Sequence, residues 1–163
     1  MCTVVVFWRV HPIAPLVVAQ CRDELVDRAA TDVERWTPAG ARAAIVSGRD
    51  AVAGGTWFAI GPRVVCALTN RRDGLGPRRG ARSRGDLVVD AAVAPDVAAV
   101  ERAAIARAGA EYGPFSLLAV DDARMLYAEN SGERDAVVVR DVEPGVHVLG
   151  NFGLDNHNDD VVR

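Results

Sequence analysis

Cys2 is the residue of this sequence with the most distinctive chemistry, because it follows the initiator methionine directly. A methionine is normally removed when the next residue is small, and its removal would leave a thiol and a free α-amine on one residue. An α-amine has a pKa of about 8, so it can act as the general base for its own side chain. The other interpretation is that Cys2 is an ordinary small residue beside the start codon.

A second polar group, residues 20–24, follows the apolar run 16–19 and places opposite charges side by side. Asp23 is suited to orient an α-ammonium group or to accept a proton from it. Arg22 is suited to lower the pKa of a thiol or to bind a substrate carboxylate with two parallel hydrogen bonds. The alternative is a salt-bridged strand end that takes no part in chemistry.

Two asparagines, Asn70 and Asn151, each follow a predicted strand. The side-chain amide of asparagine can donate a hydrogen bond to a developing oxyanion, although asparagine is also a common turn residue. Gly54 and Gly55 stand shortly before Trp57 at the start of an aromatic strand. Two glycines in this place allow either a close approach of two backbones or a bulge.

Apolar runs predict the strands that must carry these residues. We expect strands at residues 3–10, 16–19, 43–46, 56–60 and 64–68, with a hairpin turn at Gly61-Pro62 between the last two. The runs are continuous instead of alternating, which is typical of strands covered on both faces in a layered fold. Residues 71–84 then hold six arginines and one aspartate, which predicts either a solvated loop or an anion-binding rim.

Two helices separate these strands from a second group of strands. Ser83 is predicted to cap a helix over residues 84–92, and Pro95 is predicted to open a second helix that ends at Gly109. Further strands are expected at residues 115–120, 125–128, 136–139 and 146–149. Because strands and helices do not alternate regularly, a parallel doubly wound sheet is disfavoured.

The composition bounds the classes of function. The 163 residues fit a single domain, and the net charge of −3 argues against a dedicated nucleic-acid binder. All 19 basic residues are arginine, which excludes mechanisms that need lysine. Cys2, Cys21 and Cys66 form no CxxC pair, so neither a disulfide framework nor a zinc site is favoured. No apolar run approaches the ~20 residues of a membrane span and no signal peptide is evident, so we expect a soluble cytoplasmic protein with reduced thiols.

Seven short motifs follow one another along the chain. They are Met1-Cys2-Thr3, Ala19-Gln20-Cys21-Arg22-Asp23-Glu24, Gly48-Arg49-Asp50, Ala53-Gly54-Gly55-Thr56-Trp57, Leu68-Thr69-Asn70, Ser83-Arg84-Gly85 and Gly145-Val146-His147-Val148-Leu149-Gly150-Asn151. With them the chain resembles the NRDE family, also called the transport and Golgi organization protein 2 family, over nearly its whole length. The resemblance implies an α+β fold of Ntn-hydrolase type in one domain over residues 1–163. This fold is an αββα sandwich, in which two antiparallel sheets are flanked by helices.

The resemblance also implies roles for single residues. The expected catalytic residues are Cys2 as nucleophile, Arg22 and Asp23 as the groups that tune it, and Asn70 and Asn151 for orientation and the oxyanion hole. The expected ligand-binding residues are Cys21, Trp57 and Arg84. The sequence departs from the family pattern in two ways. Cys21 stands where the family motif begins with asparagine, and family members commonly continue beyond the point where this chain stops. A shortened version of the fold is therefore expected.

Two functions from different classes follow from this resemblance. The family is associated with haem trafficking and with lipid or acyl-CoA homeostasis, which favours an intracellular carrier of haem or of another amphipathic anion. No cofactor is then required, and haem is a bound ligand whose iron would be held by His11, His147, His157 or a cysteine. The alternative is an N-terminal-cysteine amidohydrolase that cleaves a linear C–N bond with Cys2 as nucleophile. The expected partner is a small amphipathic ligand, with no nucleic acid and no membrane span, and no oligomeric state is predicted.

Overall fold

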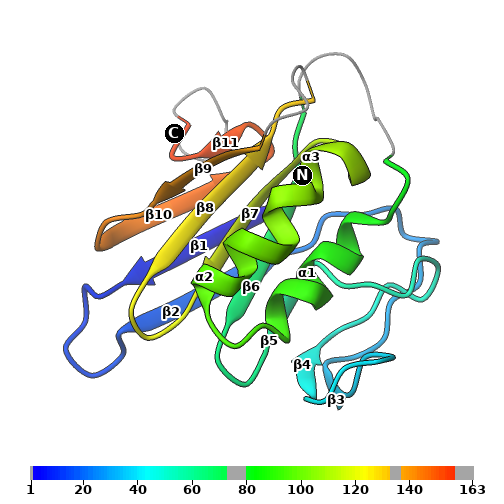
Figure 1. Cartoon of the computed structure of the whole chain (residues 1–163), viewed down its shortest axis with the longest axis horizontal. Coiled ribbons are helices and arrows are strands. Elements are labelled where there is room, and N and C mark those ends of the chain that lie inside the picture. The colour runs from blue at the N-terminus through cyan, green and yellow to red at the C-terminus, as the bar shows by residue number, and fades with distance from the viewer. Residues whose placement is uncertain (1, 73–79, 133–136, 157–163) are drawn as a thin grey trace.

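The computed structural model describes residues 2–72, 80–132 and 137–156. Strands in these ranges form two antiparallel sheets (Figure 1). The smaller sheet has the strand order β11-β10-β1-β2. Its strands are β1 (Thr3–Trp8), β2 (Leu16–Cys21), β10 (Gly145–Gly150) and β11 (Gly153–Leu154).

The larger sheet has seven strands in the order β3-β4-β5-β6-β7-β8-β9, so each strand pairs with its neighbour in the chain. Its strands are β3 (Glu34–Trp36), β4 (Ile45–Ser47), β5 (Phe58–Ile60), β6 (Val65–Asn70), β7 (Phe115–Val120), β8 (Met125–Asn130) and β9 (Val138–Asp141). The β5–β6 hairpin turns at Gly61, whose N–H donates to the Val64 carbonyl at 2.9 Å, as the Gly61-Pro62 signal predicts. Residue 136 of the predicted strand 136–139 lies outside the described residues.

The helical segment between β6 and β7 begins as predicted and then departs from the prediction. Helix α1 (Arg84–Ala92) is capped by Ser83, whose hydroxyl accepts from the N–H of Gly85 at 3.3 Å. Pro95 lies before the second helical region and is not its first helical residue; Asp96 caps this region by accepting from the N–H of Ala99 at 2.6 Å. This region is irregular, and it comprises α2 (Val97–Ala99), a π-helical turn (Val100–Ala104), a 3₁₀ turn (Ile105–Arg107) and α3 (Ala108–Glu111).

The larger sheet is the middle layer of the molecule. Strand β7 is buried along its whole length, with Phe115 and Leu117 facing the helices and Leu118 and Val120 facing the smaller sheet. Figure 1 shows α1 and α2 lying across β6 and β7. A strand covered on both faces needs apolar side chains at every position, which explains why β7 is a continuous apolar run. The expected α+β fold with two packed antiparallel sheets is thus confirmed.

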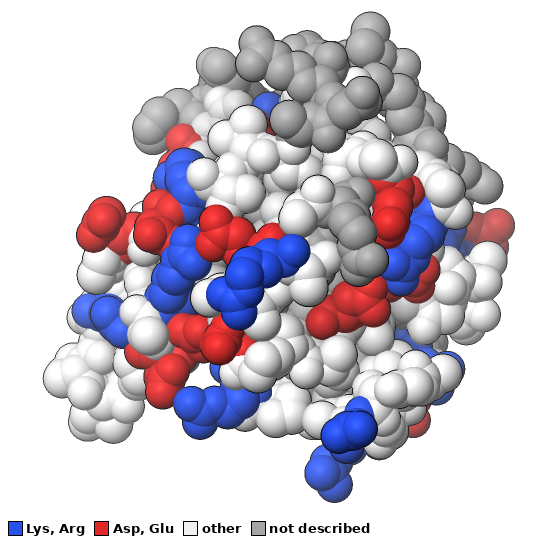
Figure 2. All heavy atoms as spheres, viewed as in Figure 1, with Lys and Arg blue, Asp and Glu red and all other residues white. Residues whose placement is uncertain are grey.

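The smaller sheet alternates between a buried face and an exposed face. Val4, Val6 and Leu149 point into the space between the sheets, whereas Phe7 and Val146 point outward and are exposed. The outer face of the smaller sheet is therefore not covered within the described ranges. On the face of the molecule that carries the helices, arginines and acidic side chains are interspersed (Figure 2). In the described part of the chain, no helix is long and apolar enough to cross a membrane.

Candidate functional site

Cys2 lies directly before β1, where it meets the ends of β6 and β10. Its backbone N–H donates to Oδ1 of Asn151 at 3.1 Å, and Nδ2 of Asn151 donates to the backbone carbonyl of Asn70 at 2.6 Å. The register of β1 on β10, which pairs Val4 with Leu149, brings Asn151 beside Cys2 although 149 positions separate them. Three of the predicted site residues therefore share one corner of the molecule.

The Cys2 thiol is partly buried, and it donates to the backbone carbonyl of Asp23 at 3.7 Å. Burial raises the pKa of the Cys2 thiol, and the negative charge of Glu24 adds to this effect, whereas the positive charge of Arg22 opposes it. The net result is a raised pKa, so the thiol is protonated at neutral pH. A reaction at this sulfur would need a base nearby, and a free α-amine on Cys2 would supply one.

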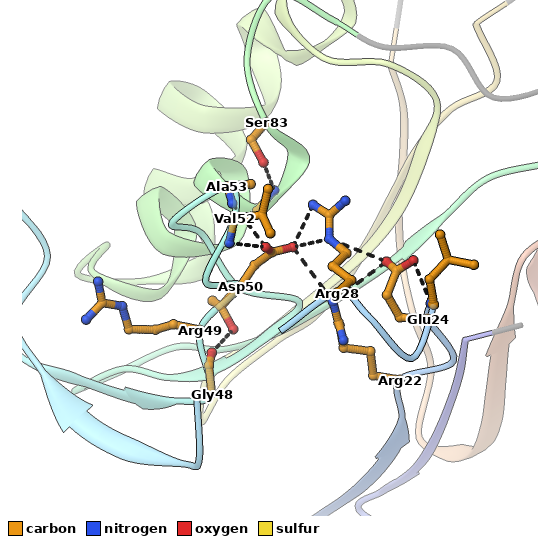
Figure 3. Close-up of polar contacts among 12 residues, drawn as sticks. Arg22, Glu24, Arg28, Gly48, Arg49, Asp50, Val52, Ala53 and Ser83 are labelled. Atoms are coloured by element: carbon orange, nitrogen blue, oxygen red, sulfur yellow. Dashed lines mark hydrogen bonds and ion pairs between the residues drawn. The ribbon is translucent and has the colours of Figure 1, made fainter. Parts of the chain in front are cut away.

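A network of charges centred on Asp50 forms one wall of the site (Figure 3). One oxygen of Asp50 accepts from the N–H groups of Val52 and Ala53 at 2.9 and 3.0 Å. The other oxygen accepts a hydrogen bond from Nε of Arg28 at 2.8 Å and forms an ion pair with Nη2 of Arg28, also at 2.8 Å. Burial alone would raise the pKa of Asp50, but the backbone N–H groups and Arg28 outweigh it and lower that pKa. Asp50 therefore stays ionised and fixes the position of Arg28.

The main contact of the Arg22 guanidinium is a cation–π interaction with the Trp57 ring. Its guanidinium carbon lies 4.5 Å from the centre of the Trp57 ring, and Nη2 lies 3.7 Å from Glu24 and 3.8 Å from Asp50. Nη2 is buried and makes no hydrogen bond among the described residues. A guanidinium that is oriented by stacking and keeps an unused donor is suited to bind a carboxylate or phosphate.

These side chains line a cavity of about 660 Å³. Its described lining includes Cys2, Glu24, Asp50, Trp57, Leu68, Asn70 and the arginines Arg22, Arg28, Arg82 and Arg84. Leu25 and Val52 also line it, and these two residues are 72% and 71% exposed. The cavity thus combines an excess of positive charge with an apolar rim.

The far wall of the cavity is the start of α1, which two glycines bring close. A Cβ on Gly55 would lie 2.5 Å from the backbone carbon of Gly85, and the N–H of Thr56 donates to the Gly85 carbonyl at 3.3 Å. Of the two roles expected for Gly55, the structure has the close backbone approach. This approach places Ser83 and Arg84 beside the cavity.

The sequence was compared with known proteins and protein families. The family model described as Transport and Golgi organisation 2 matches residues 1–162. The chain belongs to this family. It is also 33% identical over 151 residues to a protein of Bos taurus called Transport and Golgi organization protein 2 homolog, and the alignment covers 86% of this chain and 51% of that relative. The chain therefore spans about half the length of the relative, and the resemblance drawn from the seven motifs is confirmed at the level of the family.

Asp23 and Cys21 are two more of the predicted site residues of this family member; the first touches the Cys2 thiol, and the second lines no part of the described cavity. Asp23 meets the thiol through its backbone carbonyl. Cys21 pairs with Thr3 across β1 and β2 and is exposed, so its side chain lies on the opposite face of the sheet from Cys2. Cys21 is not among the described residues that line the cavity. Trp57 and Arg84, the other two expected ligand-binding residues, do line it.

The described histidines lie away from the cavity. His147 is engaged at both ring nitrogens, by Asp155 at 2.8 Å and by the Glu143 carbonyl at 2.9 Å. Nδ1 of His11, in the turn after β1, accepts two backbone N–H groups at 3.2 Å. His157 lies outside the described residues, as does the 73–79 part of the arginine-rich segment. The described residues hold no cluster of three or more potential metal ligands.

Arg28 and Asp50 are the parts of the site that the sequence did not single out as functional. Asp50 stands in the Gly48-Arg49-Asp50 motif, and its Asx-type turn with Val52 and Ala53 is a recognisable signal. The partnership with Arg28, which lies 22 positions earlier, carries no local signal. It arises because the segment after β2 folds back onto the loop after β4.

Proposed function

We propose that this chain is a ligand-handling protein that binds an amphipathic anion, such as haem or an acyl-CoA, in the cavity beside Cys2. The observation that carries the proposal is the combination, in one cavity, of an arginine with an unused buried donor and an apolar rim. Such a site suits a ligand with a carboxylate or phosphate at one end and an apolar body at the other.

The arginine-lined part of the cavity would bind the anionic end of the ligand, and the apolar rim would contact its apolar body. The Arg22 guanidinium lies over the Trp57 ring, so little side-chain freedom would be lost when it binds an anionic group. Arg84, at the start of α1, also lines the cavity, where it donates from Nη1 to the Pro114 carbonyl at 3.0 Å and would add a second positive charge near the ligand. Leu25 and Val52 expose apolar surface at the rim, and covering it with the ligand would add a hydrophobic contribution.

For haem, the Cys2 sulfur is the soft iron ligand that the described lining of the cavity offers, because His11 and His147 lie elsewhere. For an acyl-CoA, the arginines would bind the phosphates and the rim would hold the acyl chain. Neither ligand requires a further cofactor. We place this activity in the cytoplasm, where the thiols of Cys2 and Cys21 stay reduced. The name of the bovine relative refers to transport and Golgi organization, and a carrier role is compatible with those words.

The test is a titration of the purified chain with haem and with palmitoyl-CoA, followed by tryptophan quenching and, for haem, by the Soret band. Saturable binding is expected for at least one of the two ligands. Arg22→Met should weaken it about 10-fold or more, since hydrogen bonds to charged groups contribute ~1.5–3 kcal/mol. The matched control is Arg124→Met, because Arg124 also pairs with two carboxylates but is not among the described residues that line the cavity. Absence of saturable binding, or equal binding by both variants, would refute the proposal.

The second candidate is an N-terminal-cysteine amidohydrolase, and the contact between the Cys2 nitrogen and Asn151 favours it. After removal of Met1, this nitrogen would be an amine that keeps Asn151 as acceptor and can take the thiol proton. The thiolate would attack a carbonyl carbon, the C–N bond would break, the amine would leave with a proton, and water would hydrolyse the thioester. Asn70 lines the cavity and would donate to the oxyanion.

An intact mass of the protein from its native host decides whether this chemistry is available. A mass that lacks Met1 justifies a screen of linear amides, in which Cys2→Ala should abolish turnover and leave the melting temperature nearly unchanged. A mass that retains Met1 excludes the α-amine as base and leaves the binding function. Normal turnover by Cys2→Ala would also rule out the hydrolase.

A further inference from the structure

The turn between β10 and β11, which carries Asn151, is tied to the segment that follows β6. We call residues 69–72 and 150–152 the inter-sheet clasp, since each hydrogen bond between them joins one sheet to the other. These bonds run from Thr69 Oγ1 to the Gly150 carbonyl at 2.8 Å, from Asn151 Nδ2 to the Asn70 carbonyl at 2.6 Å, and from the Arg72 N–H to the Asn151 carbonyl at 2.8 Å.

Arg71 adds a side-chain contact to the clasp. Its Nη1 donates to the Phe152 carbonyl at 3.0 Å and to Oε2 of Glu129 at 2.9 Å, so one nitrogen connects the turn to β8. The Tyr127 hydroxyl donates to the same Glu129 oxygen and lies 3.2 Å from Oγ of Ser116. Burial raises the pKa of Tyr127 to about 12, so this hydroxyl keeps its proton. The arginine is thus fixed from the side of the larger sheet.

The fit between the turn and Arg71 is close. Gly153 has φ +118°, and a Cβ at this position would lie 2.9 Å from Nη1 of Arg71 and 3.2 Å from the Tyr127 hydroxyl. A side chain here would strain the backbone and push the arginine away. Glycine at position 153 therefore lets the turn rest directly on the arginine and the tyrosine.

We propose that Arg71 is a positioning residue for Cys2. It fixes the Phe152 carbonyl and with it the turn that presents Asn151, and Asn151 in turn holds the backbone N–H of Cys2. Glu129 and Tyr127 act one step further away, because they hold Arg71. The inference rests on the proposed function only in taking the Cys2 cavity as the working site, and it concerns the burial and orientation of the thiol whatever ligand binds there.

The test measures the alkylation rate of Cys2 by iodoacetamide between pH 6.5 and 10, resolved from the other cysteines by peptide mass spectrometry. Arg71→Met should loosen the turn and admit water to Cys2, so the thiol pKa should fall toward its ordinary value. The alkylation rate at pH 7.5 should rise about 2- to 10-fold, the range that corresponds to one hydrogen bond. Arg124→Met is the matched control, since it removes an arginine held by Glu101 at 2.7 Å and by Asp141. This control should lower the melting temperature comparably and leave the pH profile of Cys2 unchanged.

The inference is overturned if Arg71→Met keeps the wild-type pH profile, or if Arg124→Met shifts the profile equally, since a general loosening would do that. Should Arg71→Met fail to fold, Glu129→Gln is the second variant, and the same shift in the same direction is required of it. Tyr127→Phe keeps the pair of Arg71 and Glu129, so its shift should be smaller. A wild-type chain that binds neither haem nor palmitoyl-CoA would refute the proposed function without changing these alkylation results.

Discussion

Replacement of Asp50 by asparagine removes the charge at the centre of the cavity wall while it keeps the shape of the side chain. The asparagine oxygen can still accept from the N–H groups of Val52 and Ala53, which lie 2.9 and 3.0 Å from Oδ1 of Asp50. The amide NH₂ would then face Nε and Nη2 of Arg28, where the carboxylate accepts one hydrogen bond and forms one ion pair, both at 2.8 Å. The new NH₂ group is a hydrogen-bond donor, as are Nε and Nη2 of Arg28, so these groups could not bond to one another. Arg28 would lose its main partner.

The expected cost follows from these contacts. A hydrogen bond to a charged group contributes ~1.5–3 kcal/mol, and one such bond is lost together with the ion pair between Asp50 and Nη2 of Arg28. The Arg28 side chain is 34% exposed and can turn to water, so the low end of the range applies. We expect Asp50→Asn to lower the free energy of unfolding by about 2–3 kcal/mol, and the melting temperature by about 4–12 °C for a chain of this size.

The pH dependence gives a second, independent check. The folded-state pKa of Asp50 lies below its ordinary value, so the carboxylate stabilises the fold above the unfolded-state pKa. This stabilisation is lost as the pH falls through the folded-state pKa. The difference in unfolding free energy between wild type and Asp50→Asn should therefore be constant from pH 5 to 8 and shrink below about pH 4.

Urea unfolding followed by far-ultraviolet circular dichroism at several pH values measures both effects. The control is Asp122→Asn, because Asp122 lies 3.6 Å from Arg63 and its side chain is 79% exposed. This exposed pair should change the free energy of unfolding by less than about 0.5 kcal/mol. The reasoning is refuted if Asp50→Asn also stays within that limit at pH 7, or if its deficit persists unchanged at pH 3.

Three further outcomes are expected. Gly55→Ala should cost about 1–3 kcal/mol in thermal unfolding because its Cβ would meet the backbone of Gly85 at 2.5 Å, and a wild-type melting temperature would contradict the close packing. Iodoacetamide at pH 8 should modify the exposed Cys21 early and the buried Cys66, whose pKa is raised to about 12, only after unfolding; early labelling of Cys66 would show that the core is open. Leu117→Ala should cost about 2–5 kcal/mol by leaving a cavity between β7 and the helices, a value that chemical denaturation can check.

Local signals were sufficient for most of the strands and for α1. Continuous apolar runs marked the strands, and Ser83 marked the start of α1 because a serine hydroxyl satisfies a free N–H at a helix start. The short strands β3 and β11 were missed, since three and two residues carry too little pattern and depend on their neighbours. The prediction of one regular second helix was wrong. The apolar spacing indicated a helix, but it does not reveal the π-helical and 3₁₀ turns of residues 100–107.

For the candidate site, the family motifs predicted which residues lie near Cys2. The pairing of the strands determines which of their side chains line the cavity. Cys2, Asn70 and Asn151 lie together, as the resemblance to the family implied. Cys21 and Arg22 are adjacent in the sequence, yet Cys21, the last residue of β2, does not line the described cavity, whereas Arg22, directly after the strand, shares the cavity with Cys2. That choice depends on the register of β2 on β1, which a single sequence does not encode locally.

The partnership between Cys2 and Asn151 also has a consequence in time. Cys2 and strand β1 are made first, whereas Asn151, which follows β10, is made 149 positions after Cys2. At a synthesis rate of 5–20 residues per second, roughly 7 to 30 s pass before the corner around Cys2 can close. Throughout that interval the thiol lacks the burial that raises its pKa in the finished protein. Cys2 is therefore more exposed to oxidants and alkylating agents as a nascent chain than at any later stage in the life of the folded molecule.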